Sequence, residues 1–251
     1  PASTAYMSEQ FLADLLVWHH LAWLGETVRR TDTRVQRLIG KASGFTLHDR
    51  RELLHVIHAL VADVIGRYRQ LAARGQIELS MTPYAHPILP LLMDLKVAHE
   101  AMPTALLPVL ERYPNGEERA HWHMHEGIEV FRRFFGVAPR GCWPSEGALS
   151  TATLDLLGDL GFAWTASGEG VLRHTLASAT NTSATPKEDW LYQPRAAANG
   201  LKCFFRDDAL SDLIGFTYAT WHGDDAVNNL VHQLEQIAER AHDHPRVVAI
   251  I

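Results

Sequence analysis

Apolar side chains recur at helical spacing over several long stretches of the chain, which predicts that much of it is helical. One stretch follows Thr46, a residue type common at helix N-caps, and ends before Gly75, a residue type common just after helices. Gly136 and Gly161 follow two other stretches in the same way. The predicted helices cover residues 8–30, 47–74, 117–135, 150–160 and 225–242.

Short strands are predicted between these helices. Residues 76–82 alternate polar and apolar side chains with a period of two, as a half-buried strand does. Because strands that alternate with helices form parallel βαβ units, we expect an α/β fold with ligands at the C-terminal ends of the strands. Further strands are predicted at residues 140–143, 162–165, 203–206 and 247–251.

Two features of the chain bear on its domain organisation. Residues 168–200 are polar and irregular, so we expect a long loop or insertion there, suited to an active-site lid. The chain starts at Pro1 and ends within the apolar residues 247–251, and we therefore expect a fragment cut at both ends. With no internal repeat, one domain over residues 1–251 is the simplest expectation.

Composition and charge narrow the classes of function. The net charge is −6 and no basic stripe is present, so nucleic acid is not expected as a partner. There is no signal-peptide pattern and no apolar run of about 18 residues, which favours a cytoplasmic protein without a membrane partner. Two cysteines, Cys142 and Cys203, fit a reducing compartment. The oligomeric state is left open.

The segment from Trp143 to Glu146 carries the clearest candidate for chemistry. A predicted strand brings the Glu146 carboxylate to its C-terminal end, beside the ring of Trp143. In glycosyl transfer a carboxylate attacks or stabilises an oxocarbenium-like sugar carbon, while an aromatic ring stacks on the apolar face of a sugar. The alternative is that Trp143 belongs to the core and Glu146 caps the following helix.

His86 follows the strand predicted at residues 76–82. Pro83 and Pro87 stiffen its loop and limit the positions of the imidazole. The imidazole can donate a hydrogen bond to a sugar hydroxyl. The alternative is a turn histidine without a ligand.

Charged residues also follow the strand predicted at residues 203–206. Arg206, Asp207 and Asp208 should reach the mouth of the fold, and because adjacent residues point to opposite sides of a strand, Asp207 and Asp208 should have different tasks. We expect an active-site role for Asp207 and a structural one for Asp212, which is a candidate helix cap. Trp221 is a further candidate for contact with a substrate.

The histidine-rich tract at residues 121–126 suggests a metal site. On a helix, His121 and His125 share a face and His123 points elsewhere. Metallopeptidase sites need a Glu directly after the first His of such a pair, whereas Glu126 follows the second. A solvated helix face is the favoured interpretation. No metal or cofactor is expected, since no phosphate-binding loop, nucleophile elbow or paired-cysteine motif is present.

At these residues the chain resembles the family-57 glycoside hydrolases, a group of retaining amylases, amylopullulanases, glucanotransferases and branching enzymes. It is most similar to the bacterial amylase-like and amylopullulanase-like members. The similarity extends from Gly75 to the end of the chain. The stretches that carry it are residues 75–88, 141–147 and 204–216.

The resemblance implies an incomplete (β/α)7 barrel, with parallel strands, that acts on α-glucans. It implies that Glu146 is the catalytic nucleophile and that His86 and Trp143 contact the substrate. Two departures stand out. The His-Gln-Pro type motif of the family's first strand does not precede Ser8, and the Asp-Gly-Glu segment with the general acid does not follow residues 247–251. Asp207 is then a neighbour of the site or, less favoured, the second carboxyl group.

We therefore predict a retaining glycoside hydrolase or transglycosidase that acts on α-glucans through a covalent glycosyl-enzyme on Glu146. Arg206, Asp208 and Trp221 are predicted to bind substrate with His86 and Trp143. One alternative is a metal-dependent polysaccharide deacetylase, which would need an Asp with a His-x-x-x-His pair. The other is a glucan-binding module without turnover.

Overall fold

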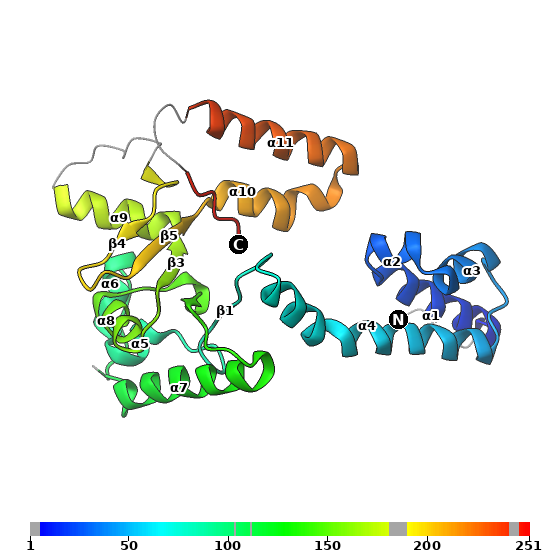
Figure 1. Cartoon of the computed structure of the whole chain (residues 1–251), viewed down its shortest axis with the longest axis horizontal. Coiled ribbons are helices and arrows are strands. Elements are labelled where there is room, and N and C mark those ends of the chain that lie inside the picture. Colours follow the sequence, from blue (N-terminus) through cyan, green and yellow to red (C-terminus); the bar gives the residue numbers. More distant parts are fainter. Residues whose placement is uncertain (1–5, 103, 111, 181–189, 241–245) are drawn as a thin grey trace. The chain divides into compact units, whose positions relative to one another are not determined.

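A computed structural model of the chain describes residues 6–102, 104–110, 112–180, 190–240 and 246–251 (Figure 1). The described residues form two compact units, a helical unit up to Gln76 and an α/β unit from Ile77 onward. Each unit has a hydrophobic core of its own. The single domain predicted from the sequence thus packs as two units, and its action as one catalytic domain stays a prediction.

The helical unit contains four helices where the sequence predicted two. The predicted helix 8–30 is interrupted because Leu24 and Gly25 adopt extended backbone angles. Ser8 caps the first of the resulting helices by accepting a hydrogen bond from the Phe11 N–H. The helices are α1 (Glu9–Trp23), α2 (Glu26–Thr31), α3 (Thr33–Lys41) and α4 (Leu47–Ala73).

The core of the helical unit is made by residues three or four positions apart on three helices, so that each helix contributes one apolar stripe. The loop between α3 and α4 adds a phenylalanine. The fully buried members of this core are Val17, Leu21, Val35, Leu38, Phe45, Leu53 and Val56.

Asp49 links α3 to the start of α4. The predicted N-cap Thr46 is confirmed: its hydroxyl accepts from the Asp49 N–H at 3.3 Å, and the Asp49 carboxylate accepts from the Thr46 N–H at 2.8 Å. The same carboxylate pairs with Lys41 and Arg37 of α3. These contacts, with that to Lys41 contributing most, hold the pKa of the Asp49 carboxyl well below its usual value.

The α/β unit is built on a five-stranded sheet of order β1-β2-β3-β5-β4. The first four strands in this order are parallel, and β4 runs antiparallel to β5. The predicted α/β class with parallel strands is confirmed, while the sheet of the described residues is open and does not close into a barrel. The strands are β1 (Ser80–Met81), β2 (Gly141–Cys142), β3 (Trp164–Gly168), β4 (Arg195–Ala196) and β5 (Lys202–Arg206).

The strands β1 and β2 are much shorter than the sequence predicted, because pairing with their neighbours is limited to two residues each. The predicted strand 247–251 lies beside β5, where Ala249 forms a single parallel bridge with Arg206 (Figure 1, marked C). The Asp207 N–H also donates to the Ala249 carbonyl at 2.8 Å.

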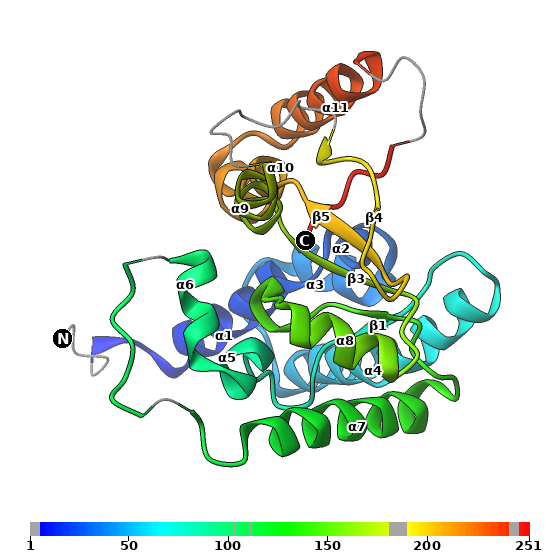
Figure 2. The ribbon, with the colours of Figure 1, turned by 90° about the vertical axis from the view of Figure 1, so that its left-hand side faces the viewer.

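Helices connect the strands of this unit and cover the sheet. Figure 2 shows α7 toward the β1 end of the sheet and α9, α10 and α11 toward the β5 end. The predicted end of α7 at Gly136 is confirmed, because this glycine has a φ of 74°. The short helices α5 and α6 were not predicted. The helices are α5 (Leu89–Met93), α6 (Ala98–Ala101), α7 (Gly116–Phe135), α8 (Thr151–Asp159), α9 (Glu169–Thr180), α10 (Asp208–Asp212) and α11 (Gly223–Glu239).

The prediction of a long loop at residues 168–200 is wrong for much of its length. Helix α9 occupies Glu169–Thr180, β4 follows at Arg195–Ala196, and residues 181–189 lie outside the described part of the chain. Leu172 and Leu176, one helical turn apart, pack with residues of β5. Their packing stabilises a helix that the many Ser, Thr and Ala residues around them do not reveal.

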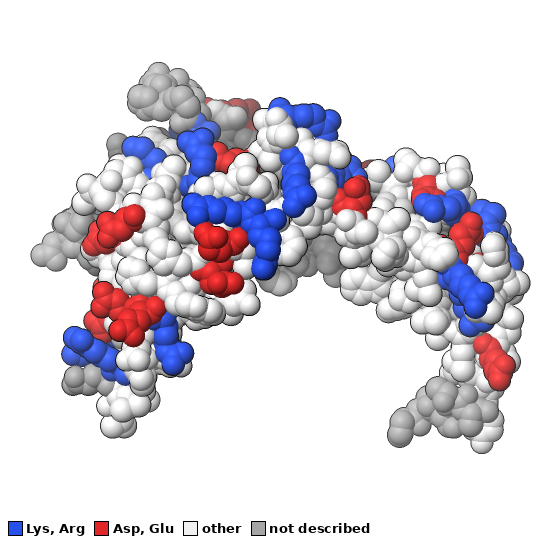
Figure 3. Space-filling view, turned by 60° about the horizontal axis from the view of Figure 1, so that its bottom comes forward, with Lys and Arg blue, Asp and Glu red and all other residues white. Residues whose placement is uncertain are grey.

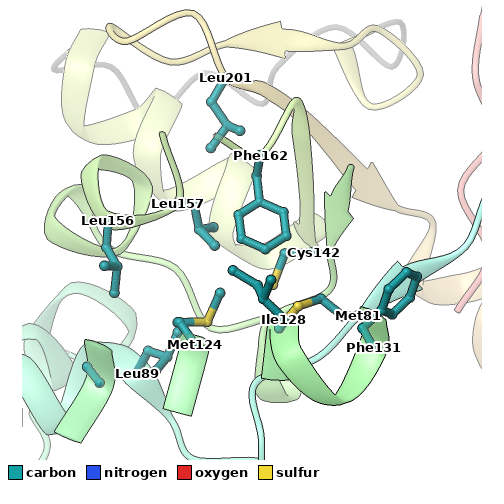
Figure 4. Packing of buried hydrophobic residues seen from close by; sticks show 11 residues of the cluster. Met81, Leu89, Met124, Ile128, Phe131, Cys142, Leu156, Leu157, Phe162 and Leu201 are labelled. Carbon is teal, nitrogen blue, oxygen red and sulfur yellow. The ribbon is translucent and has the colours of Figure 1, made fainter. Parts of the chain in front are cut away.

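The main core of the α/β unit lies between the sheet and helices α5, α7 and α8 (Figure 4). Cys142 of β2 is fully buried in it, and burial raises the pKa of its thiol to about 12. Burial also raises the pKa of Cys203 in β5. The buried members of this core are Met81, Leu89, Ala120, Met124, Ile128, Phe131, Cys142, Leu156, Leu157, Phe162 and Leu201.

On the face shown in Figure 3, acidic and basic side chains of the described residues lie beside one another, and no large patch of one charge is present. Within the described residues, no helix combines the length and the apolar character needed to cross a bilayer.

Replacing Asp49 by Asn should destabilise the helical unit at neutral pH. A carboxyl whose pKa is lower in the folded chain stabilises the fold above its unfolded pKa of about 3.9, and this contribution is lost as the pH falls toward the folded value. Thermal unfolding followed by circular dichroism should therefore show a Tm difference from the wild type that is largest near neutral pH and shrinks below about pH 4. Asp63→Asn, at an exposed position of α4, is the control. Equal effects of the two variants at all pH values would contradict the role of Asp49.

Gly116→Ala should destabilise the α/β unit by about 1–3 kcal/mol. A β-carbon at Gly116 would overlap with the backbone carbonyl of Leu92 in α5, which cannot move aside like a flexible side chain. Gly170→Ala in α9 is the matched control, since a β-carbon there meets nothing within 4 Å. Urea unfolding should leave the control unchanged or more stable by up to about 1 kcal/mol. A Gly116→Ala variant as stable as this control would show that α5 and α7 pack less closely than described.

Candidate active site

Three loops at the C-terminal ends of strands carry the candidate residues. Residues 82–88 follow β1, residues 143–149 follow β2, and residues 207 and 208 follow β5. Because these strands are parallel, their C-terminal ends lie at the same edge of the sheet. This edge is where α/β folds bind their ligands.

Glu146 lies in a tight turn directly after β2. Its backbone is left-handed, with φ 56° and ψ 19°, and its carboxylate side chain is 74% exposed. The turn is closed by the Gly147 N–H, which donates to the Pro144 carbonyl at 2.8 Å. The alternative that Glu146 caps the next helix is wrong, because α8 starts at Thr151 and is capped by Ser150.

The turn is tied to β3 and to the ring of Trp143. The buried hydroxyl of Ser167 donates to the Gly147 carbonyl. Gly147 has a φ of 66°, and a β-carbon there would lie 3.0 Å from Cη2 of Trp143. Trp143 is half-buried and packs over this glycine. The backbone N–H of Trp143 donates to the Met81 carbonyl at 2.8 Å. Trp143 thus packs against the turn that carries Glu146 and is not fully enclosed in the core.

His86 lies opposite Glu146. Its Nδ1 atom is 3.9 Å from Oε1 of Glu146, and its side chain is half-exposed. The residue ends a turn in which its N–H donates to the Pro83 carbonyl at 3.0 Å. The structure therefore brings together the two residues that the sequence singled out on different strands.

Asp207 is buried and engaged on both carboxylate oxygens. Oδ1 accepts from the Leu210 N–H at 2.8 Å and so caps α10, and Oδ2 accepts from the Tyr192 hydroxyl at 2.8 Å. Burial, reinforced by the bond to Asp207, raises the pKa of the Tyr192 hydroxyl, which stays protonated as a donor. Asp207, and not Asp212, is the cap of α10, and a catalytic role for Asp207 stays a prediction.

Arg206 and Asp208 form an ion pair at the end of β5. Nε of Arg206 is 2.6 Å from Oδ1 of Asp208, which lies next to Gly168 at the end of β3. Trp221 lies after α10, where its ring packs against Tyr218 at 5.3 Å between centroids. Roles of Arg206, Asp208 and Trp221 in substrate binding stay predictions.

The histidine-rich tract on α7 contacts the His86 loop. His123 Nδ1 bonds to the Tyr84 carbonyl at 2.7 Å, and the Tyr84 N–H donates to the His123 carbonyl at 3.1 Å. Trp122 packs edge-on against Tyr84. The interpretation of the tract as a solvated face is therefore wrong for His123. The part of the chain that the structure describes contains no group of three His, Cys, Asp or Glu side chains able to hold a metal ion.

Sequence reasoning missed three residues that support the site: Ser167, Tyr192 and His123. Ser167 continues the predicted strand 162–165, and its burial on β3 could have been expected from a longer strand. Tyr192 lies in the range interpreted as a loop. Nothing in the local sequence indicates that His123 reaches Tyr84, 39 positions away.

Comparisons with solved structures show a fold likeness. A branching enzyme from Thermococcus kodakaraensis has a TM-score of 0.52 at 12% identity over 96% of this chain and 50% of that chain. A 4-alpha-glucanotransferase from Thermococcus litoralis has a TM-score of 0.50 at 18% identity over 79% of this chain and 25% of that chain. An alpha-amylase from Thermotoga maritima has a TM-score of 0.47 at 12% identity over 80% of this chain and 32% of that chain.

This chain therefore spans between 25% and 50% of the length of these proteins. No curated protein matches the chain. The sequence model of glycosyl hydrolase family 57, in contrast, matches residues 6–251. Since this match covers nearly the whole chain, the protein belongs to glycosyl hydrolase family 57.

Proposed function

We propose that this chain is part of a retaining glycosidase or transglycosidase that acts on α-glucans, with Glu146 as its nucleophile. The observation that carries the proposal is the position of the Glu146 carboxylate, exposed at the C-terminal end of β2 and 3.9 Å from the imidazole of His86. Membership of glycosyl hydrolase family 57 supports it. So does the likeness in fold to a glucanotransferase and a branching enzyme.

The turn around Glu146 suits a nucleophile that must stay in place. Left-handed backbone is disfavoured for a non-glycine residue and persists only where its surroundings hold it. Here the Ser167 hydroxyl, the Trp143 ring and the closing hydrogen bond of the turn hold it. The Glu146 carboxylate is thereby exposed to solvent while the backbone of the residue is held in place.

The proposed reaction has two steps. In the first, an oxygen of Glu146 attacks the anomeric carbon, the glycosidic C–O bond breaks, and a carboxylic acid gives its proton to the departing oxygen. In the second, water or a sugar hydroxyl attacks the same carbon, the Glu146 carboxylate leaves, and the proton returns to the acid group. His86 would donate a hydrogen bond to a sugar hydroxyl, and Trp143 would stack on the ring.

Asp207 is better suited to positioning than to proton donation. A retaining enzyme needs its second carboxyl group about 5–5.5 Å from the nucleophile, in its protonated form before the first step. Both oxygens of Asp207 already accept hydrogen bonds, from the Tyr192 hydroxyl and the Leu210 N–H, so its carboxyl group is held within the protein and is not directed at a departing oxygen. We therefore assign Asp207 to holding α10 and Tyr192 together at the mouth of the sheet.

The parallel strands β1, β2, β3 and β5 occur along the sheet in chain order, as they would in the wall of a barrel. We propose that they belong to an incomplete (β/α)7 barrel. The alternative of a metal-dependent deacetylase has no support from the described residues, which contain no cluster of side chains able to hold a metal ion. The alternative of a glucan-binding module without turnover is distinguished from the enzyme by measuring both binding and turnover.

In the full-length protein, Glu146→Gln should lower turnover of amylose or a maltooligosaccharide by about 10⁴-fold or more, because the amide cannot form the glycosyl ester. Binding of the maltooligosaccharide, measured by calorimetry, should change by only a few-fold. Glu129→Gln, at an exposed position of α7, is the matched control and should keep full activity. Unchanged turnover in Glu146→Gln would remove Glu146 from the mechanism, and binding without turnover in the wild type would favour the binding module.

Asp207→Asn should reduce turnover by less than tenfold and leave the Tm nearly unchanged, because the Asn side-chain oxygen can still accept from the Leu210 N–H. Asp207→Ala should lower stability by about 1 kcal/mol or more through loss of the cap. Asp212→Asn, at the exposed end of α10, serves as the control. A loss of about 10² or more in kcat for a stably folded Asp207→Asn variant would instead identify Asp207 as the acid.

A further inference from the structure

Helix α7 holds the loop that carries His86 through two hydrogen bonds to a single residue. The Tyr84 N–H donates to the backbone carbonyl of His123 at 3.1 Å, and His123 Nδ1 lies 2.7 Å from the Tyr84 carbonyl oxygen. Because a carbonyl oxygen can only accept, His123 Nδ1 carries the proton of this second bond. The first bond is made by backbone alone, so the second is the contribution of the histidine side chain.

The Tyr84 carbonyl belongs to the central peptide of the turn that ends at His86. The His86 N–H donates to the Pro83 carbonyl at 3.0 Å, which makes Pro83–His86 a β-turn with Tyr84 and Ala85 at its centre. Ala85 has a φ of 56°, and a positive φ at this position is the requirement of a type II turn. Type I and type II turns differ mainly in the direction of the central peptide, and therefore in where this carbonyl points.

The turn is strained without a partner for that carbonyl. Left-handed backbone at the third position favours glycine, yet the residue there is Ala85, and His86 itself also has a φ of 56°. A turn with ordinary residues relaxes to type I when its central peptide is free to rotate. Because the adjacent His86 shares this left-handed backbone, relaxation of Ala85 would also release the φ of His86, and so move its side chain relative to Glu146.

Helix α7 is a firm support for such a contact. The adjoining face of this helix is buried in the core through Ala120, Met124 and Ile128. A β-carbon at Gly127, one turn after His123, would lie 3.3 Å from the Tyr84 nitrogen, so the helix packs directly against the backbone of the loop. The ring of Trp122 packs edge-on against both Tyr84 and His123.

We propose that His123 is a positioning residue of the site. Its Nδ1–H holds the Tyr84–Ala85 peptide in the direction that gives Ala85 a positive φ, and this keeps the His86 imidazole facing the Glu146 carboxylate. The inference rests on the proposed function for its effect on turnover, whereas its effect on the position of His86 is independent of that function.

The test compares substitutions that remove or keep the donor. His123→Leu removes it and should lower kcat/KM for a maltooligosaccharide by about 10- to 100-fold, because a misplacement of about 1 Å in an active site has an effect of this size. His123→Asn keeps an N–H at nearly the place of Nδ1 and should retain most of the activity. His125→Leu, on an exposed position of the same helix, is the matched control and should behave as the wild type.

A second variant separates positioning from general damage to the helix. Glycine adopts a positive φ without penalty, so Ala85→Gly should restore part of the activity in the His123→Leu background while changing the wild type little. A loss caused by a poorly packed α7 would not be restored by a change in the turn.

The position of His86 is followed by imidazole ¹H–¹⁵N NMR of the whole chain, with His86→Gln used to assign its signal. We expect the signal to shift in His123→Leu and to return toward the wild-type value with Ala85→Gly. Loss of activity in His123→Asn equal to that in His123→Leu, or an unchanged His86 signal in His123→Leu, would overturn the inference. If the wild type proves inactive, the proposed function fails, and the shift of the His86 signal still decides whether His123 positions this loop.

Discussion

The candidate site depends on the pairing between β1 and β2. Only two residue pairs define this register, Ser80 with Gly141 and Met81 with Cys142, and the Trp143 N–H extends it by one more bond to the Met81 carbonyl. His86 and Glu146 lie five and four positions beyond the last pair. A shift of one residue in this register would displace one loop relative to the other by about 3.3 Å along the strand. The short pairing thus sets which side chains meet.

The strained backbone of the α/β unit is concentrated at the same edge of the sheet. Among the described residues of this unit, four that are not glycine have left-handed angles, and three of them, Ala85, His86 and Glu146, lie at this edge, while Asn115 precedes α7. The two loops that contain these residues are held by different elements: α7 supports the first loop, and β3 supports the second through Ser167. Strain of this kind is typical of sites where geometry must be fixed before a ligand arrives.

The sequence predicted the long helices and the loops that carry the candidate residues, because caps such as Thr46 and Gly136 and the alternation of strands and helices are local signals. The extent of the strands was not predictable, since pairing with neighbours decides it. The helix at Glu169–Thr180 was missed because its two packed leucines are surrounded by residues typical of loops. The contact of His123 with Tyr84 depends on how α7 packs, which no local pattern reveals.

The buried thiol of Cys142 has a consequence for how the site can be observed. The side chain has no exposure and its raised pKa keeps it as a thiol, so alkylating reagents and oxidants reach it only when β2 separates from its neighbours. That separation also breaks the register on which Glu146 and His86 depend. The rate at which a maleimide modifies Cys142 therefore reports how often β2 separates from its neighbours at the edge of the sheet that carries Glu146 and His86.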